Sequence, residues 1–190
     1  MKKKFIVVVV ILVFLLVIIL LTSQQKKYVA VPSNTHPYTN HQRNLEATVS
    51  ALMVSSQKEL ARVQELSSQK HLSQQQQQEL YITAQAAITN ARAASDARPD
   101  VAATWINLSN VYQQFIGKDF QNADTFAIAS LEEAIKAEPK SYLSYYQLGM
   151  LYLQLQDYAK AKEFLQQAFT LVPEKDTRKR SEINQQLQKL

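Results

Sequence analysis

The side chains best suited to chemistry are few and scattered in this chain. Its 190 residues include three histidines, His36, His41 and His71, two glycines and no cysteine. No two histidines have the helical spacing of a metal site, and thiolate ligands are absent from the sequence. With only Gly117 and Gly149, glycine-rich phosphate loops and dinucleotide fingerprints are excluded. We therefore expect no catalytic residues, no metal and no cofactor, and turn to binding chemistry.

Helices must position any binding residues, because residues 142–175 repeat apolar side chains at helical spacing. The first half carries two tyrosines, a leucine and a glycine, and the second half carries alanines, a leucine and a closing proline. These residues are Tyr145, Leu148, Gly149, Tyr152, Ala161, Leu165, Ala168 and Pro173. Small residues let two helices approach closely, large ones fill the space between them, and proline cannot continue a helix. The spacing predicts two antiparallel helices.

A second copy of this pattern occupies residues 99–141. It consists of Trp105, Leu108, Ser109, Tyr112, Ala127, Leu131, Ala134 and Pro139. The second-helix residues of the two copies are offset by 34 positions and the first-helix residues by 40. The upstream copy therefore carries six additional residues between its helices. Residues 116–124 contain glycine, asparagine and aspartate, so we predict a lengthened inter-helix loop there.

Both copies resemble the tetratricopeptide repeat (TPR), which spans about 34 residues and carries bulky and small residues in this order. The resemblance implies a right-handed α-solenoid of stacked helix pairs that binds other proteins rather than catalyses. Ala87, Ala94 and Pro99 repeat the second-helix pattern once more, although the corresponding first-helix positions hold histidine and glutamine. A degenerate third repeat and a chance recurrence of alanines both remain open.

Residues 42–98 predict a helical hairpin ahead of the repeats. Apolar residues recur at three- and four-residue steps from Leu45 to Leu66, which indicates an amphipathic helix of about 25 residues. Ser73, followed by Gln76, resembles the capping box of a second helix. The first helix either packs within this hairpin or pairs between chains as a coiled coil, whose apolar seam Ser56 would interrupt.

Residues 176–190 predict a capping helix after the last repeat. Ile183, Leu187 and Leu190 have helical spacing within an otherwise polar segment. A stack of repeats exposes an apolar face at its last unit, and a more polar helix covers such a face. We interpret the basic cluster of residues 178–180 as the solvated side of this helix rather than a binding patch.

Residues 1–22 predict a cytoplasmic stub and a transmembrane anchor. Lys2, Lys3 and Lys4 precede seventeen consecutive apolar residues, 5–21. On an insertion scale of roughly −0.3 to −0.6 kcal/mol per residue, such a run favours the bilayer. A cleavable signal peptide is the competing interpretation, but its apolar core is usually about 7–15 residues long and a small-residue cleavage site follows it. The apolar run of this segment is longer than that, and no small-residue cleavage site follows it closely.

Lysine placement predicts how the anchor is oriented. The three lysines before it and the terminal amine outnumber Lys26 and Lys27 after it, so the amino end is expected in the cytoplasm. Residues 23–41 would form a flexible tether, and the repeats would lie outside a bacterial plasma membrane. Without the five flanking lysines, 16 basic residues balance 16 acidic ones. We therefore expect no nucleic-acid partner.

The resemblance also implies a binding groove lined by the first helix of each repeat. Its residues would be Ala103, Ile106, Asn110, Gln113, Gln114, Leu143, Tyr146, Met150, Leu153 and Gln154. These side chains are apolar or uncharged, which suits an extended or helical peptide segment. The alternative for Tyr146 and Met150 is packing against neighbouring helices or the terminal cap.

The sequence thus predicts an all-α protein in which a transmembrane helix is followed by a hairpin, a TPR-type solenoid and a capping helix. Its expected function is a membrane-anchored scaffold that docks proteins or peptide segments in envelope assembly or secretion. A self-associating structural protein that uses the helix of residues 45–66 is the main alternative. An accessory subunit of an enzyme is a more remote one.

Overall fold

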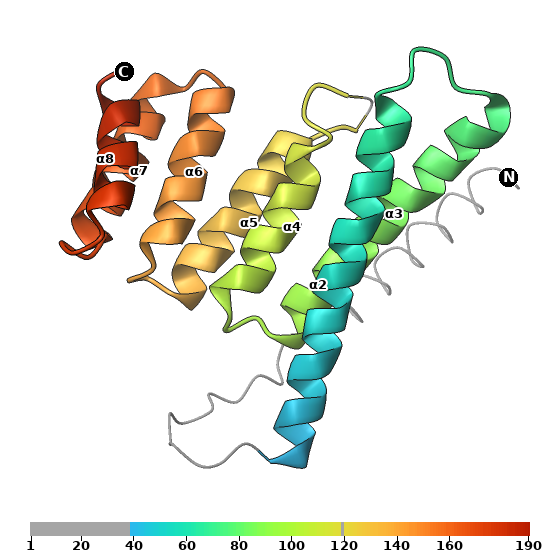
Figure 1. Ribbon diagram of the computed structural model, residues 1–190, viewed down its shortest axis with the longest axis horizontal. Helices are drawn as coiled ribbons and strands as arrows, with labels where there is room; N and C mark the ends of the chain where they lie inside the picture. The colour runs from blue at the N-terminus through green and yellow to red at the C-terminus, as the bar shows by residue number, and fades with distance from the viewer. Residues whose placement is uncertain (1–38, 119) are drawn as a thin grey trace, which may run out of the picture. The chain divides into compact units, whose positions relative to one another are not determined.

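A computed structural model describes residues 39–118 and 120–190, which fall within one structural unit (Figure 1). The predicted anchor, residues 1–22, lies outside this part of the chain, as does the predicted tether except for residues 39–41. None of the helices in the described residues has the length and apolar character needed to cross a membrane.

The described residues form seven α-helices and no strands, which confirms the all-α prediction for this part of the chain. The helices are α2 (Asn40–Ser67), α3 (Gln74–Ala97), α4 (Ala102–Gln113), α5 (Ala123–Ala137), α6 (Tyr142–Gln154), α7 (Tyr158–Leu171) and α8 (Thr177–Leu187).

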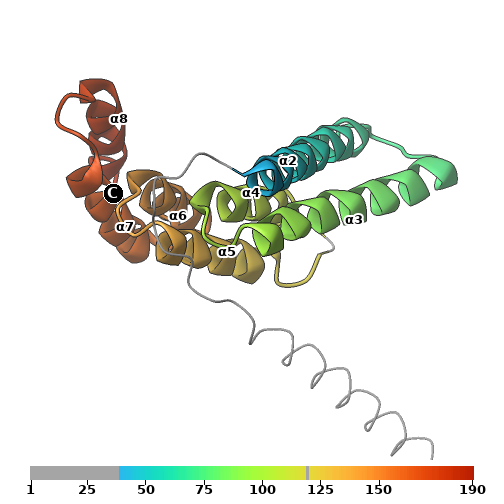
Figure 2. The same ribbon diagram turned by 90° about the horizontal axis from the view of Figure 1, so that it is seen from below.

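The helices pack as consecutive pairs that stack along the chain. The pairs are α2 with α3, α4 with α5, and α6 with α7, while α8 packs on α7 (Figure 1). Figure 2 shows α2, α4 and α6 on one side of the stack and α3, α5 and α7 on the other. We call the layer of α2, α4 and α6 the first-helix layer, and its surface turned away from α3, α5 and α7 the first-helix face.

Matching capping boxes begin α2 and α3. Thr39 Oγ1 accepts the backbone N–H of Gln42 at 3.2 Å, and the Gln42 side chain accepts the backbone N–H of Thr39 at 3.0 Å. Ser73 and Gln76 make the same exchange at 3.3 and 2.9 Å, which confirms the predicted cap. The Thr39 cap places the first helical residue at Asn40, two residues before the start of the predicted hairpin.

The connection between α4 and α5 is longer than the connection between α6 and α7. Residues 114–122 form the first and residues 155–157 the second, a difference of six residues. Gly117, at φ 74°, and Asn122, at φ 61°, have left-handed backbones in the longer connection. Glycine adopts this conformation without strain and asparagine more readily than most residues. The additional residues are thus absorbed in the loop and leave the helix pair intact.

The small and large residues of the repeats meet at the centre of the core. Six second-helix residues are fully buried: Ala127, Leu131, Ala134, Ala161, Leu165 and Ala168. In the first helices, Leu108, Tyr112, Leu148 and Tyr152 are buried. Trp105 and Tyr145 are half-buried against the core. A Cβ built on Gly149 would lie 2.8 Å from Leu165 Cγ, so α6 and α7 approach more closely than any larger residue permits.

Thr104 and Ser144 occupy equivalent buried positions in α4 and α6 but differ in their hydrogen bonds. Thr104 Oγ1 donates to the Val101 carbonyl at 2.8 Å, whereas Ser144 Oγ has no partner among the described residues. We expect Ser144→Ala to raise the free energy of unfolding by about 1 kcal/mol, because an unsatisfied hydroxyl leaves the core. Thr104→Val, the matched control, should lower it by about 1 kcal/mol. Urea unfolding measures both changes in the free energy of unfolding. Equal losses from the two substitutions would contradict the interpretation that the Ser144 hydroxyl is unsatisfied.

The apolar side of α2 packs within its own chain. Val49, Val63 and Leu66 are buried, and α2 contacts both α3 and α4. Ser56 is fully buried and accepts a hydrogen bond from Asn107 Nδ2 of α4 at 2.8 Å. The side of α2 on which a coiled coil between chains would depend is therefore already covered in this structure.

Candidate peptide-docking surface

The groove residues predicted in α4 divide into exposed and packed ones. Ala103 and Asn110 are exposed, whereas Ile106 is buried in the core. Gln113 Nε2 donates to Ser109 Oγ at 3.1 Å, and Gln114 Oε1 accepts from Gln64 Nε2 of α2 at 3.0 Å. The hydrogen bond between Gln64 and Gln114 places α2 directly beside α4 on the first-helix face.

The groove residues predicted in α6 are partly covered by α8. Tyr146, Met150 and Leu153 pack into the same apolar cluster as Ile183 of α8. Tyr146 Oη donates to Glu182 Oε1 at 2.6 Å. Only Leu143, 39% exposed, and Gln154 are open to solvent. Of the two interpretations of Tyr146 and Met150, the structure therefore favours packing against the terminal helix.

Two residues of the basic cluster at positions 178–180 contact the preceding repeat, so the prediction of a solvated side was wrong for them. Arg180 Nη1 donates to the carbonyls of Phe169 and Val172 at 3.3 and 3.0 Å, and its guanidinium lies over the Phe169 ring. Lys179 Nζ lies 4.9 Å from the centroid of the Tyr146 ring. A cation stabilises the unsatisfied carbonyls where a helix ends, and Val172 is the C-cap of α7.

The contact between Tyr146 and Glu182 predicts a loss of stability at alkaline pH. Burial, with help from the Glu182 carboxylate, raises the pKa of Tyr146 from 10.0 to about 12. The unfolded chain loses this proton near its ordinary value, so between these two values the folded state binds more protons. The stabilisation is complete below pH 10.0 and is lost as the pH rises towards about 12.

Unfolding of the native chain and of Tyr146→Phe, followed across this pH window, measures the effect. The stability of the native chain should fall more steeply than that of Tyr146→Phe. The remaining tyrosines are common to both proteins. Parallel curves of stability against pH would therefore contradict the raised pKa of Tyr146.

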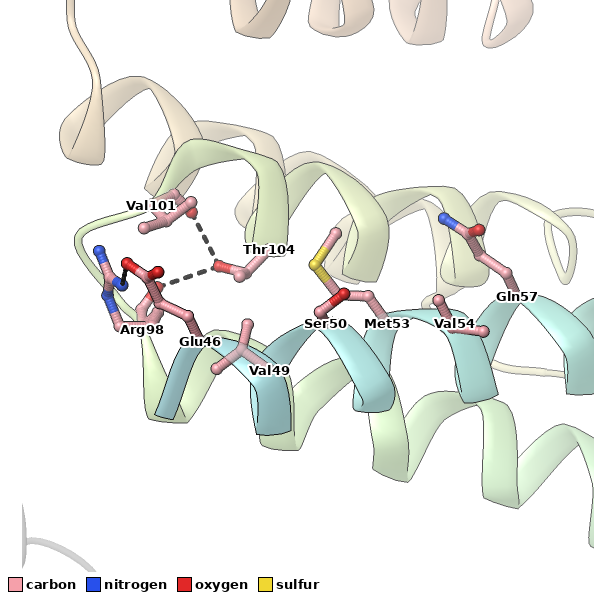
Figure 3. Close-up of a pocket in the computed structure, with 9 residues that line it drawn as sticks. All are labelled: Glu46, Val49, Ser50, Met53, Val54, Gln57, Arg98, Val101 and Thr104. Atoms are coloured by element: carbon pink, nitrogen blue, oxygen red, sulfur yellow. Dashed lines mark hydrogen bonds and ion pairs between the residues drawn. The ribbon is translucent and has the colours of Figure 1, made fainter. Parts of the chain in front are cut away.

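A pocket lies on the first-helix face where α2 passes the start of α4 (Figure 3). Its volume is about 420 Å³. Residues from α2, from α4 and from the turn before α4 line it: Glu46, Val49, Ser50, Met53, Val54, Gln57, Arg98, Val101 and Thr104. Gln57 Nε2 also donates to Asn107 Oδ1 at 3.3 Å. The pocket therefore lies along the contact between α2 and α4 that the hydrogen bond between Gln64 and Gln114 also joins.

Ion pairs fix the charged end of this pocket. Arg98 Nε and Nη2 donate to the two carboxylate oxygens of Asp100 at 2.9 and 3.1 Å, and Arg98 Nη1 lies 3.4 Å from Glu46 Oε1. The hydrogen bond from Arg98 holds the pKa of Asp100 below its ordinary value. Asp100 therefore stays ionised, and two carboxylates share one guanidinium at this end.

This pocket was not predicted from the sequence, because its walls come from two segments assigned to different domains. One signal was present in α2, whose buried residues follow one side of the helix while Val54 lies off that side and is 63% exposed. An exposed valine in the middle of an amphipathic helix is a candidate contact residue. Among the described residues, no group of three His, Cys, Asp or Glu side chains is arranged to hold a metal ion.

The sequence profile of the tetratricopeptide repeat family matches residues 142–175, which are the helix pair α6 and α7. Residues 142–175 form a tetratricopeptide repeat. The α4–α5 pair precedes this repeat with the same order of small and large residues. No curated protein matches the chain in sequence.

The chain is similar to a number of solved structures, among them two protein complexes. One, described as the CopN–Scc3 complex, shares 15% identity and a TM-score of 0.50 over 87% of this chain and 84% of that chain. The other is described as the first TPR of Spaghetti (RPAP3) bound to the HSP90 peptide SRMEEVD. It shares 19% identity and a TM-score of 0.42 over 70% of this chain and 94% of that chain. The first similarity shows a shared fold around the tetratricopeptide repeat.

Proposed function

We propose that the chain is a scaffold that docks polypeptide segments of other proteins on its first-helix face. The observation that carries this proposal is the tetratricopeptide repeat stacked on two further helix pairs, because the stack lines up α2, α4 and α6 as one surface. Exposed positions along it, such as Ala103, Asn110 and Leu143, are uncharged and partly apolar. Such a surface suits the side chains of an extended or helical segment.

Substitutions on opposite layers test the docking role. Ala103→Arg introduces a long charged side chain at an exposed position of α4, and Ala159→Arg introduces the same side chain at an exposed position of α7. We expect Ala103→Arg to reduce by at least about tenfold the partner captured after cross-linking in the native cells, because a charge must then be desolvated in the contact. Ala159→Arg should capture as much as the native chain.

Both variants should unfold at the temperature of the native chain, since both positions are exposed. Equal capture by all three proteins would contradict docking on the first-helix face. Equal loss in both variants would contradict it as well.

We further propose that residues 5–21 anchor the chain in a membrane with the helices on the extracytoplasmic side, where it would serve envelope assembly or secretion. The support is in the sequence: an uninterrupted apolar run with more lysines before it than after it. Deleting residues 5–21 should move the chain from the carbonate-resistant membrane fraction to the soluble fraction. Protease added to intact spheroplasts should cleave the native chain, and protection until lysis would contradict this orientation.

A further inference from the structure

The pocket between α2 and α4 differs in charge from the groove positions of α4 and α6. The groove positions of α4 and α6 carry no charged side chain, whereas Glu46 and Arg98 line the pocket (Figure 3). A segment lying across the first-helix face would therefore meet its strongest electrostatic discrimination at this pocket.

Carboxylate groups outnumber the cation in and beside the pocket. Both oxygens of Asp100 are engaged by Arg98, and the third donor of Arg98 reaches only one oxygen of Glu46. The other oxygen, Glu46 Oε2, makes no hydrogen bond to any residue in the described part of the chain. Arg43 lies one turn earlier on α2, is exposed and does not line the pocket. Glu46 thus has an oxygen available for a second cation.

Aliphatic side chains adjoin this carboxylate. Val49 and Val101 line the pocket next to Glu46, whereas Met53 and Val54 line it two turns further along α2 (Figure 3). Lysine and arginine side chains place an apolar stem against such a surface while their charged tip reaches a carboxylate. A purely aliphatic side chain would cover the valines and leave Glu46 Oε2 without a partner. An acidic side chain would be repelled by Glu46 and Asp100.

We propose that this pocket binds a lysine or arginine side chain of the docked polypeptide segment, with its stem on Val49 and Val101 and its cationic tip at Glu46. The proposal rests on the docking function and adds the residue type that the surface selects. Because the Glu46 side chain is 43% exposed, solvent screens the new ion pair. We therefore expect a preference of about twofold to fivefold, as a partly exposed ion pair gives.

Fluorescently labelled hexapeptide pools test the proposal, with one position fixed as lysine, as its neutral analogue norleucine or as glutamate. Binding to the 190-residue chain in phosphatidylcholine nanodiscs is followed by fluorescence anisotropy. At one position of the hexapeptide, the lysine pool should bind about twofold to fivefold more tightly than the norleucine pool. Glu46→Gln should remove this preference, and Glu46→Lys should turn it towards the glutamate pool.

Arg43→Gln is the matched control, because it removes a charge one turn from Glu46 but outside the pocket. It should keep the preference for lysine. Equal binding of the lysine and norleucine pools to the native chain would overturn the proposal, and so would a lysine preference that persists in Glu46→Gln. In either case peptides still bind and the docking function stands. Binding of no pool would contradict the docking function itself.

Discussion

Gly149→Ala is expected to lower the free energy of unfolding by about 1–3 kcal/mol. In an ordinary helix interior the same substitution stabilises by about 0.8–1 kcal/mol, because alanine has the higher helix propensity. Here the new methyl group would lie 2.8 Å from Leu165 Cγ and 3.1 Å from the Leu165 backbone nitrogen. Leu165 is fully buried, so α7 itself must move to relieve the overlap. Urea unfolding of the 190-residue chain in a non-ionic detergent measures the difference.

A second substitution separates this overlap from a general loss of packing. Leu165→Ala alone should cost about 2–5 kcal/mol, because it leaves a cavity in the core. In the double variant the methyl group introduced by Gly149→Ala would occupy part of that cavity, so the loss should be smaller than the sum of the two single losses. Additive losses, or a Gly149→Ala variant more stable than the native chain, would contradict the close approach of α6 and α7.

Ser56→Ala is expected to lower the free energy of unfolding by about 1–3 kcal/mol, although it removes a single oxygen atom. Asn107 Nδ2 donates to Ser56 Oγ at 2.8 Å, and both side chains are buried between α2 and α4. Without the serine, the amide donor of Asn107 stays buried without an acceptor, which costs more than the net value of one hydrogen bond. Thermal or urea unfolding measures this loss.

The double variant Ser56→Ala/Asn107→Leu should recover most of the stability, because both partners of the buried hydrogen bond are then apolar. Gln64→Ala is the matched control. It removes an exposed hydrogen bond between the same two helices, 3.0 Å long, and should cost less than about 0.5 kcal/mol. Equal losses in the free energy of unfolding for Gln64→Ala and Ser56→Ala would contradict the claim that the buried Ser56–Asn107 hydrogen bond stabilises the packing of α2 on α4.

The helix pairs of the repeats were predictable from sequence because residue size determines how closely two helices approach. Gly149, Ala161 and Ala168 leave no room for larger groups, and Leu148 and Leu165 fill the space that remains. These requirements are local to one helix pair, so they are visible in the order of residues along the chain. The capping box of Ser73 and Gln76 is local in the same sense.

The candidate surface was less predictable, because it depends on which helices become neighbours. The repeat pattern predicted Tyr146 as a groove residue, but whether it faces a ligand or α8 depends on where Glu182 is placed. Nothing in the order of residues fixes that contact. The pocket beside Glu46 likewise forms only when α2 passes the start of α4, and no repeat position describes α2.

The role of Arg180 shows a signal that was present but misread. Its distance from the end of α7 is short, and a basic side chain just beyond a helix commonly reaches the last carbonyls. Charge alone suggested solvation, whereas the structure uses the guanidinium to satisfy the Val172 carbonyl at 3.0 Å. A basic residue that follows a predicted helix end should be tested as a cap before it is assigned to the surface.

Site-specific photo-cross-linking tests the docking role of the first-helix face most directly. A photoreactive amino acid is placed at Val54 or Leu143 on that face, and at Tyr81 or Phe126 in the opposite layer. The native side chains are 63% and 39% exposed in the first pair and 64% and 42% exposed in the second, so exposure is matched. In cells that make the chain naturally, we expect Val54 and Leu143 to cross-link to a polypeptide and Tyr81 and Phe126 not to. Cross-links from Tyr81 and Phe126 alone, or equally from all four positions, would contradict the account.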